Sequence, residues 1–215
     1  MKLPLFPLNT VLFPGMLLPL HIFEPRYREM INLCLTERQP FGVVLIKAGE
    51  EVAAPAAPHP IGTYGQVSRA ERLPDGRMHI EMIGQERFRI LTLHHDHAYL
   101  TGTVEKFPLA QPDCAQAVTL AQALKPWLGR YLKLLGDAAE TSFDVQDLPD
   151  NPAAVAYLAA IVAQIPLREK QALLSLGAAA ELLERERALY RREVSLIRAM
   201  LTSQQACHDP DLSPN

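Results

Sequence analysis

The densest group of residues that could do chemistry is a run of three histidines and one aspartate at positions 94–97. On a β-strand His95 and His97 would share one face, because successive side chains alternate, and they could offer two ligands to a metal ion. A catalytic zinc site needs three protein ligands and a closed one needs four, so others would have to come from residues such as His79 or Asp75. The simpler interpretation is a solvated turn, since the run separates two apolar stretches. We therefore predict no metal site.

Cysteine chemistry offers a second possibility. The chain has three cysteines, Cys34, Cys114 and Cys207, which are scattered and form no CxxC pair. This pattern indicates neither a disulfide framework nor a zinc ribbon, and it fits a reducing compartment. Cys34 could act as a nucleophile, but it falls on the apolar face of an expected helix, and we interpret it as a buried structural thiol. We expect the protein in the cytoplasm.

Several motifs that enzymes require are missing from the sequence. It contains no GxxxxGK[ST] phosphate loop, no GxGxxG after a strand, no GxSxG nucleophile elbow and no HExxH zinc motif. Each of those sites needs glycines or ligands at fixed spacing, so their absence argues against the corresponding activities. We expect a protein that is not an enzyme and uses no cofactor.

Composition excludes further classes of protein. Hydrophobic residues make up 48% of the 215 positions and charged residues 21%, which is enough for a buried core. The net charge of -3 and the pI of about 6.2 argue against binding nucleic acid by bulk phosphate neutralisation. Pro14, Pro19 and His21 interrupt the longest apolar stretch near the N-terminus, so we expect no membrane span and no signal peptide.

The first half of the chain has the pattern of a β-rich domain. Short apolar runs separated by proline and glycine predict strands at residues 3–6, 17–22, 41–46, 61–73, 77–83, 88–93 and 99–107. The sequence Pro74-Asp75-Gly76 predicts a tight hairpin turn, in which glycine supplies the positive φ. Pro25 predicts the first residue of a helix, because its missing N–H costs nothing there. The apolar face of that helix is expected to consist of Tyr27, Met30, Ile31 and Cys34.

The composition changes near Pro108, and helical periodicity follows. Apolar spacing predicts helices from about residue 114 to 135, from 152 to 165, from 167 to 176 and from 178 to 201. The last of these carries an apolar stripe that includes Leu182, Leu189 and Leu196. The sequence thus predicts an α+β protein with a β-rich domain over residues 1–107, a helical bundle over residues 108–201 and a disordered tail over residues 202–215.

Three pieces of the first half, in order, resemble a known family. They are LPLFPLNTVLFPG at 3–15 continuing as LPLHIFEPRYR at 18–28, then IGT at 61–63, then LPDGR at 73–77 with GQERFRI at 84–90. Together they resemble the Lon N-terminal (substrate-binding) domain family, tightly in the first half and loosely to about residue 201. The resemblance implies a PUA-like β pseudo-barrel followed by a helical bundle. It also implies a role in recognising unfolded or tagged protein substrates.

In full-length Lon proteases, members of peptidase family S16, an ATPase domain and a Ser–Lys protease domain follow this region. The present chain ends at Asn215, so we expect a free-standing, non-catalytic member that binds protein clients and acts in protein quality control. The alternative is an RNA-binding PUA-like module, although the acidic pI and the lack of a basic run longer than Arg191-Arg192 weigh against it. A role as an enzyme would depend on the histidine run.

Aromatic and arginine side chains dominate binding hot spots, and they guide the choice of candidate partner-binding residues. Within the family motifs we select Phe23, Arg26, Tyr27, Arg87 and Phe88. Arg87 and Phe88 are adjacent in a predicted strand and must point to opposite faces, so only one of them can be exposed. A purely structural role for these motifs stays open, with Glu24 pairing Arg26 or Arg28 near a helix N-terminus.

Overall fold

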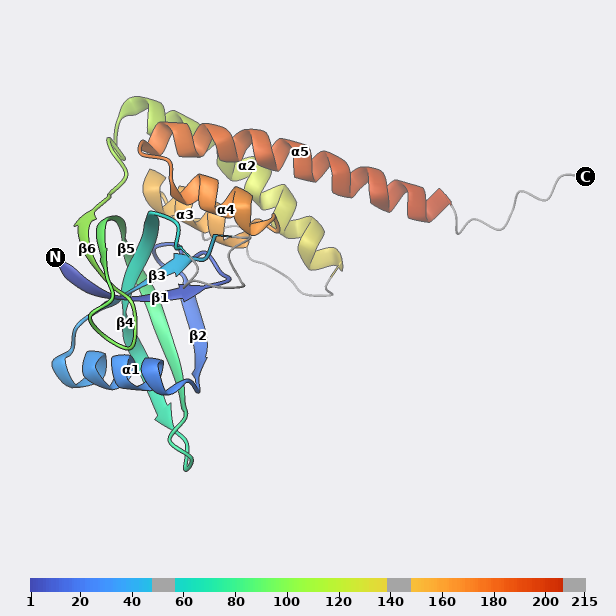
Figure 1. Ribbon diagram of the computed structural model, residues 1–215. Helices are drawn as coiled ribbons and strands as arrows, with labels where there is room; N and C mark the ends of the chain where they lie inside the picture. The colour runs from blue at the N-terminus through green and yellow to red at the C-terminus, as the bar shows by residue number, and fades with distance from the viewer. Residues whose placement is uncertain (48–56, 139–147, 207–215) are drawn as a thin grey trace, which may run out of the picture. The chain divides into compact units, whose positions relative to one another are not determined.

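The computed structural model describes residues 1–47, 57–138 and 148–206, and the chain divides into two compact units (Figure 1). The β unit comprises residues 1–110 and 160–177, and the helical unit comprises residues 111–159 and the chain from 178 onward. The predicted α+β class is confirmed. The predicted contiguous bundle over 108–201 is wrong in one respect, because the segment 160–177 belongs to the β unit. The predicted tail also begins too early, since a helix continues to Ala206; its remainder lies outside the described residues.

The β unit is built on one mixed sheet of six strands in the order β2-β5-β4-β3-β1-β6 (Figure 1). Its strands are β1 (Lys2–Leu8), β2 (Leu17–Ile22), β3 (Phe41–Leu45), β4 (Ile61–Arg72), β5 (Met78–His94) and β6 (Thr101–Lys106). Only β1 and β3 run parallel; the other described pairs are antiparallel. Because β6 pairs with β5 as well as β1, five strands close into a barrel. The sixth, β2, pairs with β5 alone among the described strands and lies outside that ring.

The predicted β4–β5 hairpin is confirmed, with Gly76 at φ +80° and an Asp75 carboxylate accepting the N–H of Arg77 at 3.0 Å. The structure differs beyond it: the two strands expected over 77–93 are one strand, β5. Its register against β4 shifts at Gly84, where a Cβ would overlap the carbonyl oxygen of Phe13. Gly84 therefore marks a bulge inside a continuous strand and not its end.

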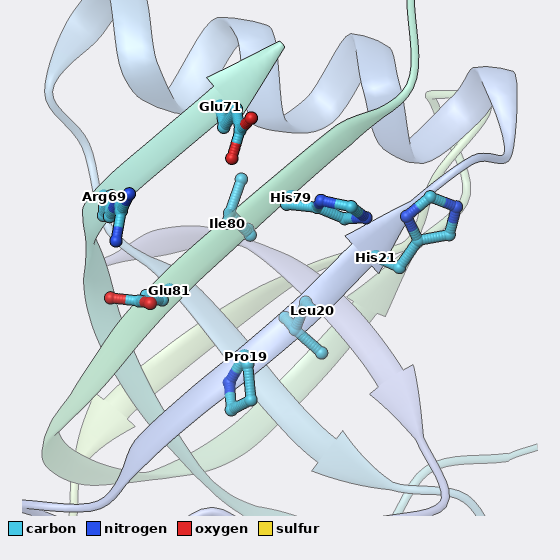
Figure 2. Close-up of a pocket in the computed structure, with 8 residues that line it drawn as sticks. All are labelled: Pro19, Leu20, His21, Arg69, Glu71, His79, Ile80 and Glu81. Atoms are coloured by element: carbon cyan, nitrogen blue, oxygen red, sulfur yellow. The ribbon is translucent and has the colours of Figure 1, made fainter. Parts of the chain in front are cut away.

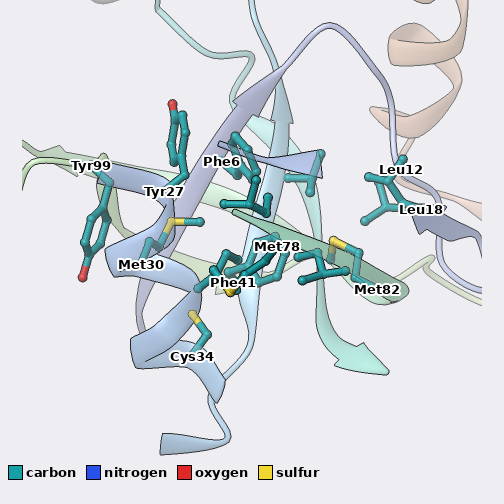
Figure 3. Packing of buried hydrophobic residues seen from close by; sticks show 14 residues of the cluster. Phe6, Leu12, Leu18, Tyr27, Met30, Cys34, Phe41, Met78, Met82 and Tyr99 are labelled. Carbon is teal, nitrogen blue, oxygen red and sulfur yellow. The ribbon is translucent and has the colours of Figure 1, made fainter. Parts of the chain in front are cut away.

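The main core of the β unit lies between α1 (Pro25–Glu37) and the sheet. Pro25 occupies the first turn of α1, as predicted. The four apolar residues predicted for the inner face of this helix are all buried (Figure 3). The ring of Tyr27 lies 4.1 Å from that of Phe6 on β1, and Phe41 on β3 also contacts Phe6. Burial of the Cys34 thiol in this cluster raises its pKa to about 12. The interpretation of Cys34 as a structural residue is thereby confirmed.

The helical unit contains α2 (Ala115–Ala138), most of α3 (Pro152–Val162) and α5 (Ala179–Ala206). As predicted, Asn151 caps α3, its side-chain oxygen accepting the N–H of Ala154 at 3.0 Å. The hydroxyl of Tyr190 on α5 donates to the carbonyl of Ala159 on α3 at 2.7 Å, and its ring meets Tyr131 of α2 edge-on. None of the described helices combines the length and apolar composition that crossing a bilayer needs.

The apolar stripe of α5 is buried over only part of its length. Leu182, Leu189 and Tyr190 are buried, whereas Leu196 and Met200, nearer the C-terminal end, are exposed. The sequence pattern correctly predicts the burial of Leu189. It extends the buried face too far, because periodicity records which residues share a face and not how much of that face is covered.

Truncating the two halves of the stripe should therefore have unequal effects. We expect Leu189→Ala to lower the free energy of unfolding by about 2–5 kcal/mol, as core truncations do. The matched variant Leu196→Ala should change it by less than about 0.5 kcal/mol, as is usual at the surface. Urea denaturation of both variants measures the difference, and equal effects would contradict the described packing of α5.

One charged residue is buried in α5. The side chain of Glu186 is fully buried, and neither carboxylate oxygen has a hydrogen-bond partner among the described residues. Burial raises the pKa of Glu186 well above its usual range, because the charged form loses its hydration. The folded chain therefore holds a proton on this carboxyl at pH values where the unfolded chain has released it.

This difference makes stability fall as pH rises. Between the usual glutamate pKa and the raised folded value, the native state binds more protons than the unfolded state, so each pH unit costs at most about 1.4 kcal/mol. We expect Glu186→Gln to remove this loss of stability. The free energy of unfolding of the variant should therefore exceed that of the wild type by an amount that grows from pH 5 to pH 8. The control is Glu184→Gln at an exposed position of the same helix. Guanidinium denaturation at several pH values measures the free energy of unfolding of each protein. If wild type and Glu186→Gln show the same pH dependence, Glu186 does not have a raised pKa in the folded chain.

Candidate functional site

Three of the five candidate residues lie together where β2 meets α1. The chain turns sharply there, with Glu24 in an extended conformation before the helix-starting Pro25 and its carbonyl accepting the N–H groups of Tyr27 and Arg28. Phe23 occupies this turn and is 58% exposed. Its ring stacks on His21 of β2, with centroids 5.9 Å apart. A large apolar side chain is thus held at the surface by two rigid elements.

Arg26 and Tyr27 have structural contacts beside Phe23. The guanidinium of Arg26 contacts the carboxylate of Glu24 at 2.7 Å and lies over the ring of Tyr27 at 4.6 Å. Tyr27 is itself buried against Phe6, and burial raises the pKa of its hydroxyl. The open alternative of a Glu24–Arg26 ion pair is therefore what the structure shows. These contacts fix the turn and leave Phe23 as the exposed apolar group.

A groove of about 740 Å³ opens beside this turn. One wall is formed by β2 and the start of α1, the other by the end of β1, and the segment that joins β5 to β6 lines it as well. Most of the lining side chains are aliphatic or aromatic, and the polar ones are His21, Glu24, Arg26, His95 and His97. Its apolar lining consists of Phe6, Pro7, Leu8, Leu20, Phe23, Tyr27, Ile46, Ala57, Pro58, Leu93, Ala98, Tyr99 and Leu100.

A smaller hollow of about 390 Å³ lies on the outer face of the sheet (Figure 2). Leu20 and His21 line both this hollow and the groove. The ring of His21 lies 4.8 Å from that of His79 on β5. Charged residues of β4 and β5 complete its lining, namely Arg69, Glu71 and Glu81. Strand β2 is thus flanked by an apolar groove and a charged hollow.

The histidine run begins at His94, the last residue of β5, and continues into the segment before β6. His95 and His97 are exposed, and the ring of His97 stacks on Tyr99 at 5.1 Å. Asp96 is engaged by the ammonium of Lys2 at 2.6 Å, and this contact lowers the pKa of the carboxyl to about 2. Within the described residues, no three histidine, cysteine or acidic side chains come close enough to share a metal ion. Residues 95–97 thus form an exposed connection between two strands, as the sequence predicted.

The comparisons with known proteins agree on one family. The profile of the ATP-dependent protease La (LON) substrate-binding domain matches residues 2–190. The chain belongs to this family. It is 28% identical to the Lon protease of Parabacteroides distasonis over 96% of its own length and 26% of that protein. It is 25% identical to the Lon protease of Flavobacterium johnsoniae over 82% of its own length and 22% of that protein. The chain thus spans about a quarter or less of these curated relatives.

Solved structures support the same assignment. The crystal structure of a Lon N-terminal domain protein from Xanthomonas campestris is 26% identical and superposes with a TM-score of 0.64, covering 86% of this chain and 96% of that one. The N-terminal domain of the Mycobacterium avium complex Lon protease has a TM-score of 0.70 at 17% identity, covering 89% and 98%, and it supports the fold alone. The resemblance stated from the three sequence pieces is confirmed.

The remaining two candidates are not on the surface of this Lon-type domain. Phe88 is completely buried in a second core cluster with Leu3, Leu5 and Val44, and Arg87 is 1% exposed. The choice of these two as partner-binding residues is corrected, because both faces of β5 are covered at this point. Neither side chain can reach a partner in the folded chain.

Arg87 has a structural function that the sequence did not indicate. Its guanidinium donates to the carbonyls of Leu174 at 2.7 Å and Leu176 at 2.6 Å, at the end of α4 (Leu167–Leu174). The positive charge thus meets the negative end of the helix dipole. A second contact holds the same helix, because the Gln171 side chain donates to the carbonyl of Ile61 on β4 at 3.0 Å. This explains why α4 belongs to the β unit.

The groove walls were also missed by sequence reasoning. For Tyr99 and Leu100 the sequence predicted only the start of a strand. The available signal was that apolar residues flank the polar run at 94–97 on both sides. That signal does not say that these residues lie opposite β2, which is about 75 positions away in the sequence.

Replacing Arg87 should release α4. We expect Arg87→Leu to lower the free energy of unfolding by about 2–5 kcal/mol, since two charge-assisted hydrogen bonds are lost and the buried carbonyl of Leu174 loses its donor. Arg89→Leu is the matched control: Arg89 is exposed and pairs with Glu105, so its loss should cost about 0–1 kcal/mol. Thermal and urea denaturation measure the stability of both variants. Equal losses of stability would contradict the role of Arg87 in holding α4.

Proposed function

We propose that this chain is a non-catalytic substrate-recognition module whose groove binds exposed apolar segments of unfolded protein clients. The observation that carries the proposal is the exposed Phe23 on the rim of the apolar groove. Complete burial of a phenylalanine side chain is worth about 1.5–3 kcal/mol, and more than half of Phe23 is still exposed, so a client that covers it gains affinity. Membership of the Lon substrate-binding domain family supports the same role.

The size and lining of the groove fit this class of ligand. Its volume of about 740 Å³ falls in the range of pockets that enclose small ligands or several side chains. Phe6 and Tyr27 form a fixed apolar floor, because each is packed in the main core. The groove therefore exists before a client arrives, which reduces the ordering cost of binding.

The charges near the groove favour protein over RNA. Arg26 is already paired with Glu24, and most of the remaining lining is apolar. An RNA-binding surface would need several arginine or lysine side chains directed at phosphates. Salt-dependent retention of RNA would still revive that alternative. The cytoplasmic location, which rests on the scattered cysteines, is part of this proposal.

A pair of equally exposed apolar residues allows a matched test. Phe23 and Leu91 are 58% and 56% exposed, but only Phe23 lines the groove. With reduced, carboxymethylated α-lactalbumin as an unfolded probe, we expect Phe23→Ser to weaken binding about tenfold, the equivalent of about 1.4 kcal/mol of lost contact. Leu91→Ser should bind like the wild type. Fluorescence anisotropy of the labelled probe measures the affinities.

Folded α-lactalbumin with its disulfides intact is the negative ligand, and circular dichroism confirms that each variant is folded. If Phe23→Ser and Leu91→Ser bind the unfolded probe equally well, the groove is not the recognition site. If neither the wild type nor the variants distinguish folded from unfolded probe, the recognition role itself is wrong.

A further inference from the structure

The edge of β2 that borders the groove offers main-chain groups for hydrogen bonding. The N–H of Gly84 donates to the carbonyl of Met16 at 2.9 Å, which fixes the direction of the following peptide groups. Main-chain groups alternate along an antiparallel strand, so Leu18, Leu20 and Ile22 point theirs toward β5. Those of Leu17, Pro19 and His21 point to the open edge.

No described residue pairs with that edge. In the strand order β2 is terminal, and no hydrogen bond joins its outward main-chain groups to any described part of the chain. The edge presents the N–H groups of Leu17 and His21 and the carbonyls of Leu17, Pro19 and His21. Unpaired groups in this alternation are a template for another strand.

The groove borders the C-terminal end of the same strand. Leu20, His21 and Phe23 line it from the β2 side, and residues 6–8 of β1 line it from the other side. On the outer face of the sheet, Leu17 and its cross-strand partner Ile83 are both exposed. A strand laid against β2 would therefore send alternate side chains into the groove where it passes Leu20 and His21, and the others toward the outer face.

We propose that an extended client segment adds to β2 as a further strand, with its main chain on the β2 edge and alternate apolar side chains in the groove. This inference rests on the proposed function and specifies how the groove and the β2 edge bind the substrate. The ligand class is an unfolded segment of about six residues, the length of β2, with apolar side chains at every second position.

Pro19 decides between a client and a second copy of the chain. Because it has no N–H, an added client strand loses one hydrogen bond at that position. Two β2 strands pairing with each other would lose two, one for each proline. Proline on an open edge is a known protection against pairing of identical edges. The edge therefore favours a client with all its N–H groups over self-association.

The test is a scan of backbone methylation in a defined probe. The probe is a labelled nonapeptide in which valine or phenylalanine alternates with serine or threonine between terminal lysines. Single N-methylation should weaken binding with a period of two: positions facing β2 lose about two- to tenfold, the size of one net hydrogen bond, and the intervening positions keep their affinity. Fluorescence anisotropy measures each peptide against the wild-type chain.

A variant of the protein tests the same edge from the other side. Pro19→Val restores the missing N–H without removing a bond to β5, so it should tighten peptide binding about two- to tenfold. If the variant does not fold, the methylation scan on the wild type still decides. A flat scan with binding that still depends on Phe23 overturns strand addition and leaves the proposed function intact.

Two other results also overturn the inference. A probe that binds without dependence on Phe23, or does not bind at all, removes the proposed function together with it. A wild-type chain that dimerises on analytical ultracentrifugation, with peptide competing against the dimer, assigns the β2 edge to a second copy.

Discussion

The architecture of the β unit depends on the bulge at Gly84 within β5. This single strand pairs with β2 and β4 in its first part and with β4 and β6 in its second, so it has to change direction between them. A side chain at position 84 would overlap the backbone of Phe13, and one at Gly65 would overlap the carbonyl of Ile83. The close approach of three backbones therefore requires glycine at both positions. Beyond the bulge β5 pairs with β6, so β2 stays outside the closed barrel, with one edge that no described strand pairs.

The same stretch of β5 holds α4. Three residues after the bulge, Arg87 reaches the end of α4, and the rings of Phe88 and Tyr64 pack nearby on the other side. The family motif GQERFRI is thus a structural motif in this chain: glycine bends the strand, arginine holds a helix and phenylalanine fills the core. Its residues affect the groove only indirectly, because they fix the position of β5, the strand with which β2 pairs.

Local features of the fold were predictable from the sequence because local chemistry decides them. Pro25 and Asn151 begin helices, Pro74-Asp75-Gly76 closes a hairpin, and the apolar face of α1 follows from its spacing. Arg87 was not predictable, since its type and its place in a strand are typical of a surface residue. The residues that cover it include the end of α4, which is about 90 positions away in the sequence. The groove was missed for the same reason, because its walls come from segments that meet only in the fold.

Recognition of unfolded chains sets two demands that conflict in an ordinary apolar pocket. The site has to accept many sequences, yet an exposed apolar surface invites self-association. In the proposed strand addition, main-chain pairing meets the first demand, because every client offers the same N–H and C=O groups whatever its side chains. Pro19 helps to meet the second demand, which is to avoid self-association. Two paired β2 edges would lack two hydrogen bonds, whereas a client strand on one edge would lack only one. An open edge with one proline beside an apolar groove is therefore better suited to transient, sequence-tolerant binding than either feature alone.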